Sequence, residues 1–274
     1  MTQHVAVIVG VGGMGQAIAR RVDPAAHLLL ADFDAKLLDG AADRLVGEGY
    51  TVTRQAVDVS DRASVTALAE KASSLGEVRT VVHTAGLSPV QAPVAAILAV
   101  DLLGVALVLE EFGKVVAEGG AGLVISSMAG HGHPPFTPEQ AGTLTATPTD
   151  QLLSLPLTAE AGFAHPGAAY SFAKKVNQLH VQAASTTWGA RGARINSISP
   201  GVISTPMGQQ ELAGEHGAHM RAMIESSNAR RAGTPADIAA AADFLLGPAA
   251  SFISGTDLLV DGGVIAAAAT TPRG

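Results

Sequence analysis

The pair Tyr170 and Lys174 is the first place where this chain could do chemistry. The sequence has only two tyrosines, and one of them lies in AAYSFAKKVNQ (168–178), four residues before a lysine. Side chains at positions i and i+4 share one face of a helix. A nearby ammonium lowers the pKa of a phenol. The spacing predicts an acid–base pair that exchanges a proton with an alcohol oxygen; the structural alternative is a surface helix that carries both residues by chance.

Two serines could hold the oxygen of such an alcohol. Ser126 and Ser127 end the apolar run of LVISSMAG (123–130), so we expect them at the carboxyl end of a strand. Ligands of open α/β sheets bind outside the carboxyl ends of the strands. Either serine is therefore a candidate donor to the reacting oxygen.

A glycine motif near the start predicts a dinucleotide site. VIVGVGGMGQAIA (7–19) contains Gly10, Gly12 and Gly15 after an apolar run and before a helical pattern. Bare Cα atoms let the backbone approach a pyrophosphate, which the N–H groups of a helix N-terminus bind. The next apolar run ends at Asp32, where a carboxylate accepts hydrogen bonds from ribose hydroxyls. With no Lys or Arg among the glycines or directly after Asp32, the sequence favours NAD over NADP; a solvated acid at a strand end is the alternative.

Three histidines near the middle of the chain raise the question of a metal site. His131 and His133 form H-x-H, and His165 follows in the same Pro-rich region. A metal would need further ligands placed by rigid elements. We therefore predict no metal, and expect substrate contact or plain surface histidines.

Composition excludes several classes of function. The chain has 274 residues, 47% of them hydrophobic and 15% charged, with a net charge of −7 and no cysteine. This apolar content can bury a large core, and the negative charge argues against nucleic acid or an anionic membrane surface as partner. No apolar run approaches a membrane span, and we see no signal peptide. The lack of cysteine is consistent with a cytoplasmic location.

Apolar runs of strand length alternate with helical patterns along the whole chain. We expect strands at 4–9, 27–32, 51–57, 79–84, 122–126, 193–198 and 256–260, with helices near 13–22, 35–47, 61–75, 93–118 and 168–188. Runs that are apolar on both faces are typical of a parallel sheet covered by helices on each side. The alternation predicts an α/β fold, a doubly wound (Rossmann) parallel sheet, as a single domain over 1–274.

Two segments fit this alternation less well. Residues 131–168 contain six prolines and several apolar side chains, and we read them as an insertion between the strand at 122–126 and the helix at 168–188. Because a long loop in a compact domain is usually functional or disordered, we predict that the insertion forms an ordered wall or lid over the substrate. Residues 207–231 could form a second lid on the substrate side, or pack as ordinary amphipathic helices.

Together these motifs resemble the short-chain dehydrogenases/reductases over about 4–263. The resemblance is carried by the glycine motif, VDVSD (57–61), HTAG (83–86), ISSMAG (125–130), Tyr-x-x-x-Lys, INSISPGVISTPM (195–207) and SGTDLLVDGG (254–263). These motifs follow one another in the family's order, which is more specific than any one of them.

The resemblance implies a role for each matching residue. It makes Tyr170 the general acid/base, Lys174 the group that binds the nicotinamide ribose and lowers the tyrosine pKa, and Ser127 the group that polarises the substrate oxygen, with Asp101 as a fourth catalytic candidate. The residues that motif and resemblance assign to the dinucleotide, besides Tyr170 and Lys174, are Gly10, Gly12, Gly13, Met14, Gly15, Asp32, Phe33, Asp58, Val59, Thr84, Ala85, Gly86, Pro200, Gly201, Ile203 and Thr205. Those expected at the substrate are Ser127, Met128, His133 and Met207.

The chain departs from the family pattern in four places. The glycine loop is one residue shorter than the commonest form. His83 and Thr84 replace two asparagines, and Asp101 stands where the family has an asparagine whose main-chain carbonyl holds a relay water. Ser127 and Tyr170 are also unusually far apart, because the insertion lies between them.

The resemblance implies an NAD(H)-dependent oxidoreductase that interconverts a secondary alcohol and a ketone, both small molecules. The alternatives are an NADPH-dependent biosynthetic ketoreductase and a non-catalytic dinucleotide-binding regulator. The resemblance also implies a homotetramer that forms through helices 93–118 and 168–188 and the C-terminal strand.

Overall fold

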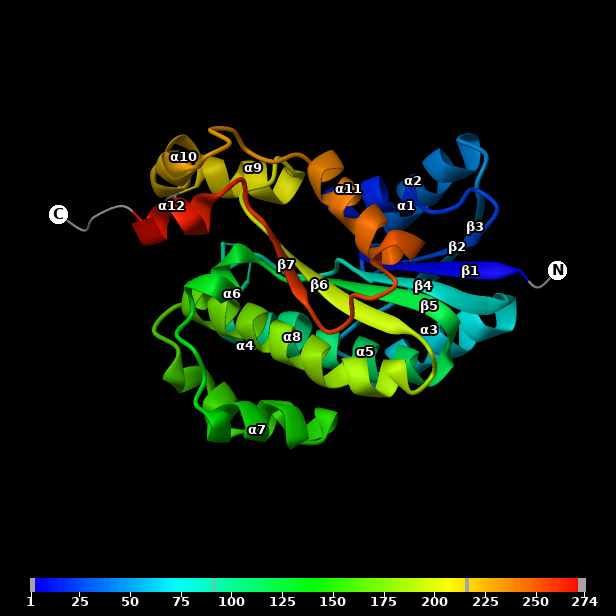
Figure 1. Ribbon diagram of the computed structural model, residues 1–274, viewed down its shortest axis with the longest axis horizontal. Helices are drawn as coiled ribbons and strands as arrows, with labels where there is room; N and C mark the ends of the chain where they lie inside the picture. Colours follow the sequence, from blue (N-terminus) through cyan, green and yellow to red (C-terminus); the bar gives the residue numbers. More distant parts are fainter. Residues whose placement is uncertain (1–2, 91, 215–216, 271–274) are drawn as a thin grey trace.

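The computed structural model describes residues 3–90, 92–214 and 217–270. Its centre is a seven-stranded sheet in the order β3-β2-β1-β4-β5-β6-β7, with every neighbouring pair parallel (Figure 1). The strands are β1 (His4–Val9), β2 (His27–Asp32), β3 (Thr51–Ala56), β4 (Glu77–His83), β5 (Val116–Ile125), β6 (Arg194–Pro200) and β7 (Asp257–Val260). The strand order reverses between β1 and β4, and the predicted doubly wound Rossmann sheet is confirmed.

Helices cover both faces of the sheet (Figure 1). One face carries α1 (Gly13–Ala19), α2 (Ala35–Gly47) and α11 (Pro235–Leu246), and the other carries α3 (Arg62–Leu75), α5 (Gly104–Val115) and α8 (Pro166–Gly189). The central strands are buried on both faces, which explains their unbroken apolar sequence. The remaining elements are α4 (Val94–Ile97), α6 (Met128–Gly132), α7 (Pro138–Ala146), α9 (Pro206–Ala213), α10 (Gly217–Ser226), α12 (Val264–Thr270), the π-helix η1 (Leu98–Leu103) and the 3₁₀-helices η2 (Thr149–Ser154), η3 (Pro156–Thr158), η4 (Glu160–Gly162) and η5 (Pro248–Ala250).

The prediction of one helix over 93–118 is wrong in two respects. The helix ends at Val115, and β5 begins at Val116 instead of at residue 122. Gly119 has a φ of +74°, a left-handed conformation that a helix cannot contain and that glycine adopts without cost. The segment is also interrupted by the π-helix η1, which contains Asp101. Single π-helical turns often mark functional sites.

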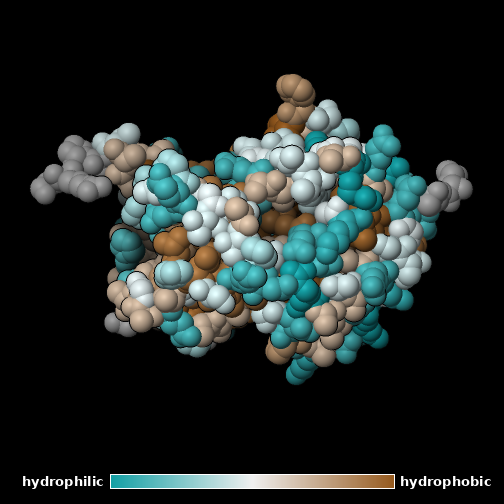
Figure 2. Space-filling view, turned by 90° about the horizontal axis from the view of Figure 1, so that it is seen from below, coloured by the Kyte–Doolittle hydropathy of each residue, from teal (hydrophilic) through white to brown (hydrophobic). Residues whose placement is uncertain are grey.

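The insertion at 131–168 is ordered. It contains α7 and η2–η4, and α7 lies outside α8 and α5, on the side away from the sheet (Figure 1). Leu144 and Leu152 are 1% exposed and pack with Ile97, Leu102 and Val176 of the underlying helices. The surface on this side mixes hydrophilic and hydrophobic residues (Figure 2). The middle of the insertion therefore covers the outer helical layer, and only its two ends lie near the predicted catalytic residues.

Arg62 attaches the insertion to the rest of the domain. Its guanidinium contacts Asp150 of η2 at 2.7 Å, Glu110 of α5 at 2.9 Å and Glu111 of α5 at 2.6 Å. The hydrogen bond from Arg62 lowers the pKa of Glu110 to about 2. On the other side of the insertion, His180 Nε2 of α8 lies 3.0 Å from the carbonyl oxygen of Leu144. None of the helices in the described part of the chain is long and apolar enough to cross a membrane.

Candidate active site

A cleft of about 460 Å³ lies at the carboxyl ends of β1, β2 and β4. The strand order reverses at this point, which is where open α/β sheets bind ligands. The cleft is lined by Gly10, Gly12, Asp32, Phe33, Asp34, Leu37, Val57, Asp58, Val59, Ser60, Thr84, Ala85, Gly86, Leu87, Val100 and Met207. Ten of the predicted cofactor or substrate residues are thus brought together from distant parts of the chain, and no Lys or Arg is among the lining residues.

The glycine loop is shaped by close backbone contacts. Gly10 has a φ of +91°, and a Cβ there would lie 2.4 Å from the backbone nitrogen of Ala85. A Cβ on Gly15 would lie 2.0 Å from the carbonyl oxygen of Gly10. Gly12, by contrast, faces the cleft with open space around the position of a Cβ, and α1 begins directly after it. This arrangement fits a pyrophosphate held at the N-terminus of a helix.

Asp32 closes the cleft at the end of β2. Its carboxylate accepts a hydrogen bond from Val11 N at 2.7 Å and one from Asp34 N at 3.0 Å. Arg20 and Arg21 point elsewhere, because they pair with Glu48 and Asp243. Asp32 therefore fixes the glycine loop and also presents negative charge to the cleft.

Thr84 and Asp58, which were also predicted to bind the cofactor, make hydrogen bonds that hold the loops around the cleft. The Thr84 hydroxyl donates to the Gly10 carbonyl at 2.7 Å and so ties the loop after β4 to the loop after β1. Asp58 accepts hydrogen bonds from both the backbone nitrogen and the hydroxyl of Ser60, at 2.9 and 2.6 Å. Both residues line the cleft next to neighbours that the sequence predicted, Val59, Ala85 and Gly86.

The segment after β6 borders the glycine loop. Thr205 caps α9 by accepting a hydrogen bond from Gly208 N at 3.1 Å. A Cβ on Gly13 would lie 3.0 Å from the Thr205 methyl group, which places the two loops in contact. Ile203 forms a bridge to Gly233, and Met207 reaches into the cleft. Pro200, Gly201 and Met14 lie near these loops without lining the cleft.

The predicted catalytic groups come from the turn after β5, which contains Ser127, from η1, which contains Asp101, and from α8, which contains Tyr170 and Lys174. The Ser127 side chain is within hydrogen-bonding reach of the Tyr170 hydroxyl and lowers its pKa, and Lys174 Nζ lies 5.3 Å from the centre of the Tyr170 ring. The neighbouring Ser126 faces the other way, and its buried hydroxyl donates to the Lys174 carbonyl at 2.8 Å. Ser127 is thus the serine of the pair that reaches the tyrosine, while Ser126 anchors β5 to α8.

Asp101 contacts Lys174 directly. The carboxylate lies 2.9 Å from Lys174 Nζ and accepts a hydrogen bond from Leu87 N, and both charged side chains are almost fully buried. Burial raises the pKa of Asp101, an effect that Lys174 opposes. Burial also disfavours the ammonium, but Asp101 and Tyr170 outweigh it and raise the pKa of Lys174. A Cβ on Gly86 would lie 2.6 Å from the Asp101 carboxylate, so the pair needs glycine at this position.

The expected lowering of the tyrosine pKa is not what the structure gives. Burial raises the pKa of Tyr170, Lys174 lowers it, and Asp101 raises it again. The desolvation of the phenol is larger than the attraction of an ammonium whose charge is shared with Asp101. His83, which replaces an asparagine of the family pattern, is buried beside the same lysine. Burial and Lys174 lower its pKa to about 3, so it is neutral.

The three histidines of the insertion do not converge. His131 lies 2.7 Å from Asp257 at the start of β7. The His133 ring packs against Phe136 and Phe172, with ring centres 5.0 and 5.7 Å apart. His165 caps α8 by accepting a hydrogen bond from Ala168 N. His133 is therefore part of an aromatic cluster outside the cofactor cleft, while Met128 directly follows Ser127. In the part of the chain that the structure describes, no group of three or more His, Asp or Glu side chains is placed to hold a metal.

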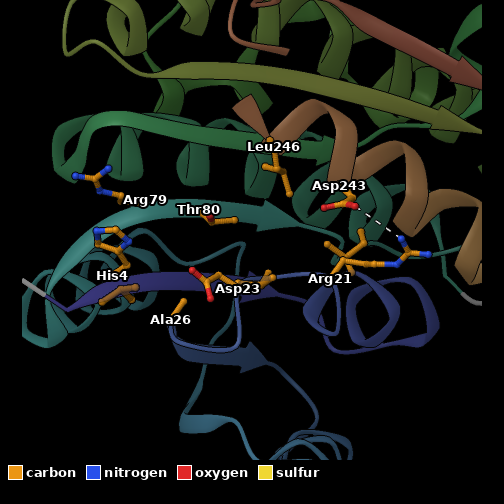
Figure 3. A pocket seen from close by; sticks show the side chains of 12 residues that line it. His4, Arg21, Asp23, Ala26, Arg79, Thr80, Asp243 and Leu246 are labelled. Carbon is orange, nitrogen blue, oxygen red and sulfur yellow. Dashed lines mark ion pairs between the residues drawn. The ribbon is translucent and has the colours of Figure 1, made fainter. Parts of the chain in front are cut away.

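A second cavity, of about 220 Å³, lies at the amino ends of β1 and β4, opposite the cleft. Figure 3 shows its wall: His4 and Arg79 come from the starts of β1 and β4, and Arg21 pairs with Asp243 across 3.7 Å. The charged side chains of this pair are about half exposed. None of the predicted chemical residues lines this cavity, so the cleft at the carboxyl ends is the candidate active site.

Some residues at the cleft were not named from the sequence. Leu87 and Val100 line it, and Glu211 lies within hydrogen-bonding reach of Ser88, the residue after Leu87. Glu211 could have been identified from the sequence, because it follows Met207 by four residues and both lie on one face of the short helix α9.

Comparison with known proteins agrees with this geometry. A family model described as Enoyl-(Acyl carrier protein) reductase matches residues 10–140 and 151–265. The chain is 44% identical over 267 residues to the short-chain dehydrogenase/reductase bsc3 of Alternaria brassicicola, covering 97% of both chains. It is 30% identical to galactitol 2-dehydrogenase (L-tagatose-forming) of Cereibacter sphaeroides, covering 94% of this chain and 93% of the other. A short-chain type dehydrogenase/reductase structure from Mycobacterium ulcerans has the same fold, with a TM-score of 0.75, 22% identity and coverage of 96% and 90%.

Proposed function

The chain belongs to the short-chain dehydrogenase/reductase family, and we propose that it is an NAD(H)-dependent oxidoreductase that interconverts a secondary alcohol and a ketone. The observation that carries the proposal is that Ser127 lies within reach of the Tyr170 hydroxyl, beside the buried Lys174–Asp101 ion pair. Relatives named as dehydrogenases, galactitol 2-dehydrogenase among them, support oxidation of an alcohol. A regulator that only binds a dinucleotide would not need these four side chains.

We propose a separate task for each group. A bound nicotinamide supplies hydride transfer to or from the carbinol carbon. Ser127 donates a hydrogen bond to the substrate oxygen, and the Tyr170 phenol gives or takes the proton on that oxygen. Lys174 is held in place by Asp101 and is expected to contact the nicotinamide ribose. Asp101 acts through Lys174, and we therefore regard it as a positioning residue.

The preference for NAD rests on Asp32. A 2′-phosphate on the ribose would meet the Asp32 carboxylate, and the lining of the cleft contains no cation to offset it. The same carboxylate would accept hydrogen bonds from the ribose hydroxyls of NAD. An NADPH-dependent ketoreductase is the second candidate; it would need basic residues around the end of β2, where the cleft has Asp32, Phe33 and Asp34.

We also propose that the two ends of the insertion form the substrate wall. Phe136 and Phe163 pack against Phe172, with ring centres 5.5 and 5.3 Å apart, in the cluster that Tyr170 joins. Phe163→Ala should raise KM for an alcohol and leave NADH affinity unchanged. A change in NADH affinity alone would contradict this role. Of the segment 207–231, Met207 lines the cleft, and we propose that the described part of this segment borders the substrate.

The proposed assembly follows from the exposed surfaces. The insertion already occupies the outer face of α8 and α5, so a tetramer that uses this face would have to displace it. β7 is one of the two edge strands of the sheet, and edge strands readily pair with another chain. Phe252, just before β7, is fully exposed. We propose that copies meet at β7, and that Phe252→Glu shifts the sedimentation coefficient toward that of a monomer.

One experiment tests the enzymatic proposal. A panel of secondary alcohols and ketones is assayed with NAD(H) and with NADP(H), following the absorbance of the reduced nicotinamide. Turnover with NAD(H) at a higher kcat/KM than with NADP(H) is expected. Saturable NADH binding without turnover on any member would favour the regulator, and a preference for NADPH would favour the ketoreductase.

A further inference from the structure

The helix α9 brings a carboxylate to the rim of the cleft. Met207, in its first turn, lines the cleft. Glu211 is one turn further along and lies on the same face. The side chain of Glu211 is half-buried. It therefore lies one helical turn beyond Met207, next to the cleft and outside its lining.

Ser88 fixes the position of this carboxylate. Ser88 follows Leu87, a lining residue of the cleft, and is 1% exposed. The Ser88 hydroxyl is within hydrogen-bonding reach of the Glu211 side chain: burial raises the pKa of Glu211, and Ser88 lowers it. Where α9 ends, a Cβ on Gly214 would lie 3.9 Å from a methyl group of Val90. The helix is thus seated on the segment 87–90, and Glu211 cannot simply rotate into solvent without losing its buried partner.

The charge of Glu211 reaches the reacting groups. Burial, Lys174 and Asp101 have the larger effects on the pKa of Tyr170, and Glu211 raises it further. Tyr170 also packs against an apolar cluster that Leu87, Phe136 and Phe163 border as well. A carboxylate has about four lone-pair positions, so the bond from Ser88 leaves room for another donor.

We propose that Glu211 accepts a hydrogen bond from a second hydroxyl group of the substrate. The substrate would then be an uncharged diol or hydroxy ketone on an apolar skeleton. A cationic substrate is disfavoured because it would lie near Lys174 and lose its hydration among apolar side chains. An anionic substrate would be repelled by Glu211. This inference rests on the proposed function and adds the class of substrate to it.

The test compares alcohols that differ by one hydroxyl. Cyclopentanol and cyclohexanol are assayed against the corresponding 1,2- and 1,3-diols, with rates corrected for the number of carbinol groups. Wild type should favour the diol of a pair by about tenfold or more in kcat/KM, as expected for a charge-assisted hydrogen bond. Glu211→Gln should reduce this preference to about threefold or less, and leave kcat/KM for the mono-alcohol within about twofold at its optimum pH. Ser88→Ala should give an intermediate preference.

A matched control separates this effect from a general loss of charge. Glu225 is an exposed residue of α10 in the same segment, and Glu225→Gln should keep the wild-type preference. Glu211→Gln should also move the acid limb of the kcat/KM profile to lower pH, because a negative charge near Tyr170 disfavours the phenolate. A purely structural role for Glu211 would not move this limb.

These assays separate a failure of the proposed role of Glu211 from a failure of the proposed dehydrogenase function. Equal kcat/KM for diol and mono-alcohol in wild type, or equal losses for both in Glu211→Gln, would overturn the inference while leaving the dehydrogenase intact. If wild type oxidises none of these alcohols and none of the wider panel with either cofactor, the proposed function itself has failed.

Discussion

The cleft and the insertion bury their residues in opposite ways. In the cleft, charged groups such as Asp101 and Lys174 are buried beside a cavity, and the Tyr170 phenol is desolvated. In the insertion, Leu144 and Leu152 fill space between helices, and the charges of the Arg62 cluster are partly exposed. The cost of desolvating two buried charges can exceed their mutual attraction even when they are paired, whereas burying a leucine is favourable. The cleft is therefore built for chemistry at the expense of stability, and the middle of the insertion for stability.

This contrast predicts two kinds of variant. Changes in the cleft should alter turnover more than stability, and changes in the middle of the insertion should do the reverse.

The largest effect is expected from Tyr170→Phe. The ring and its packing remain, but the proton that is exchanged with the substrate oxygen is lost. We expect kcat to fall by about 10² to 10⁴-fold, with NADH affinity and thermal stability close to wild type. Near wild-type kcat would remove Tyr170 from the mechanism.

Leu144→Ala is the corresponding change in the insertion. Leu144 is 1% exposed between α7 and the helices beneath it. Its truncation should lower the free energy of unfolding by about 2–5 kcal/mol and leave kcat of the folded enzyme near wild type. Leu153→Ala is the control, because Leu153 is 37% exposed in the neighbouring η2 and should cost far less. Urea denaturation of the three proteins measures the difference, and equal losses for both variants would contradict the packing.

Asp32→Asn tests the cofactor end of the cleft. Asparagine keeps an oxygen that can accept the hydrogen bond from Val11 N, so the glycine loop should stay in place while the charge is lost. We expect the ratio of kcat/KM for NAD over NADP to fall by about tenfold, corresponding to ~1.4 kcal/mol. An unchanged ratio would show that other residues set the cofactor preference.

Arg62→Met probes the charged attachment of the insertion. Arg62 holds the pKa of Glu110 at about 2 in the folded protein, below the ordinary value. The resulting stabilisation is therefore present above about pH 4.5 and is lost as the pH falls toward 2. Arg62→Met should lower the free energy of unfolding by about 1 kcal/mol or less near neutral pH, because solvent screens these partly exposed pairs. On acidification the variant should lose less stability than wild type. Arg54→Met, which removes exposed ion pairs with Asp39 and Asp43, is the control.

The smallest effect is a displacement of the pH profile in Asp101→Asn. The carboxylate of Asp101 raises the pKa of Tyr170, so its neutralisation should lower that pKa. The acid limb of kcat/KM for alcohol oxidation should move to lower pH, while the maximal rate changes less than in Tyr170→Phe. A limb that moves to higher pH would contradict the direct electrostatic role of Asp101.

The sequence predicted most of the fold because its signals are local. Strand boundaries agree within a few residues where an apolar run meets glycine or a polar residue, as at Val9 and Asp32. The helix at 93–118 failed because its apolar residues continue into β5, and periodicity cannot place the end of a helix within an unbroken apolar run. The glycine motif and Asp32 could be predicted from the sequence because each is recognised at the end of a single strand. Close backbone contacts after β1 require glycine, and Asp32 is the last residue of β2.

What the sequence determined by itself was the order of the elements, the dinucleotide cleft and the pairing of Tyr170 with Lys174, since each rests on spacing along one or two adjacent elements. Only the tertiary structure decided which serine faces the tyrosine, that Asp101 is close enough to Lys174 to share its charge, and that burial raises the pKa of Tyr170. It also placed the middle of the insertion on the outer helical layer and brought Glu211 beside Ser88. These features depend on distances and desolvation between segments that are far apart in the chain, which no local pattern of residues records.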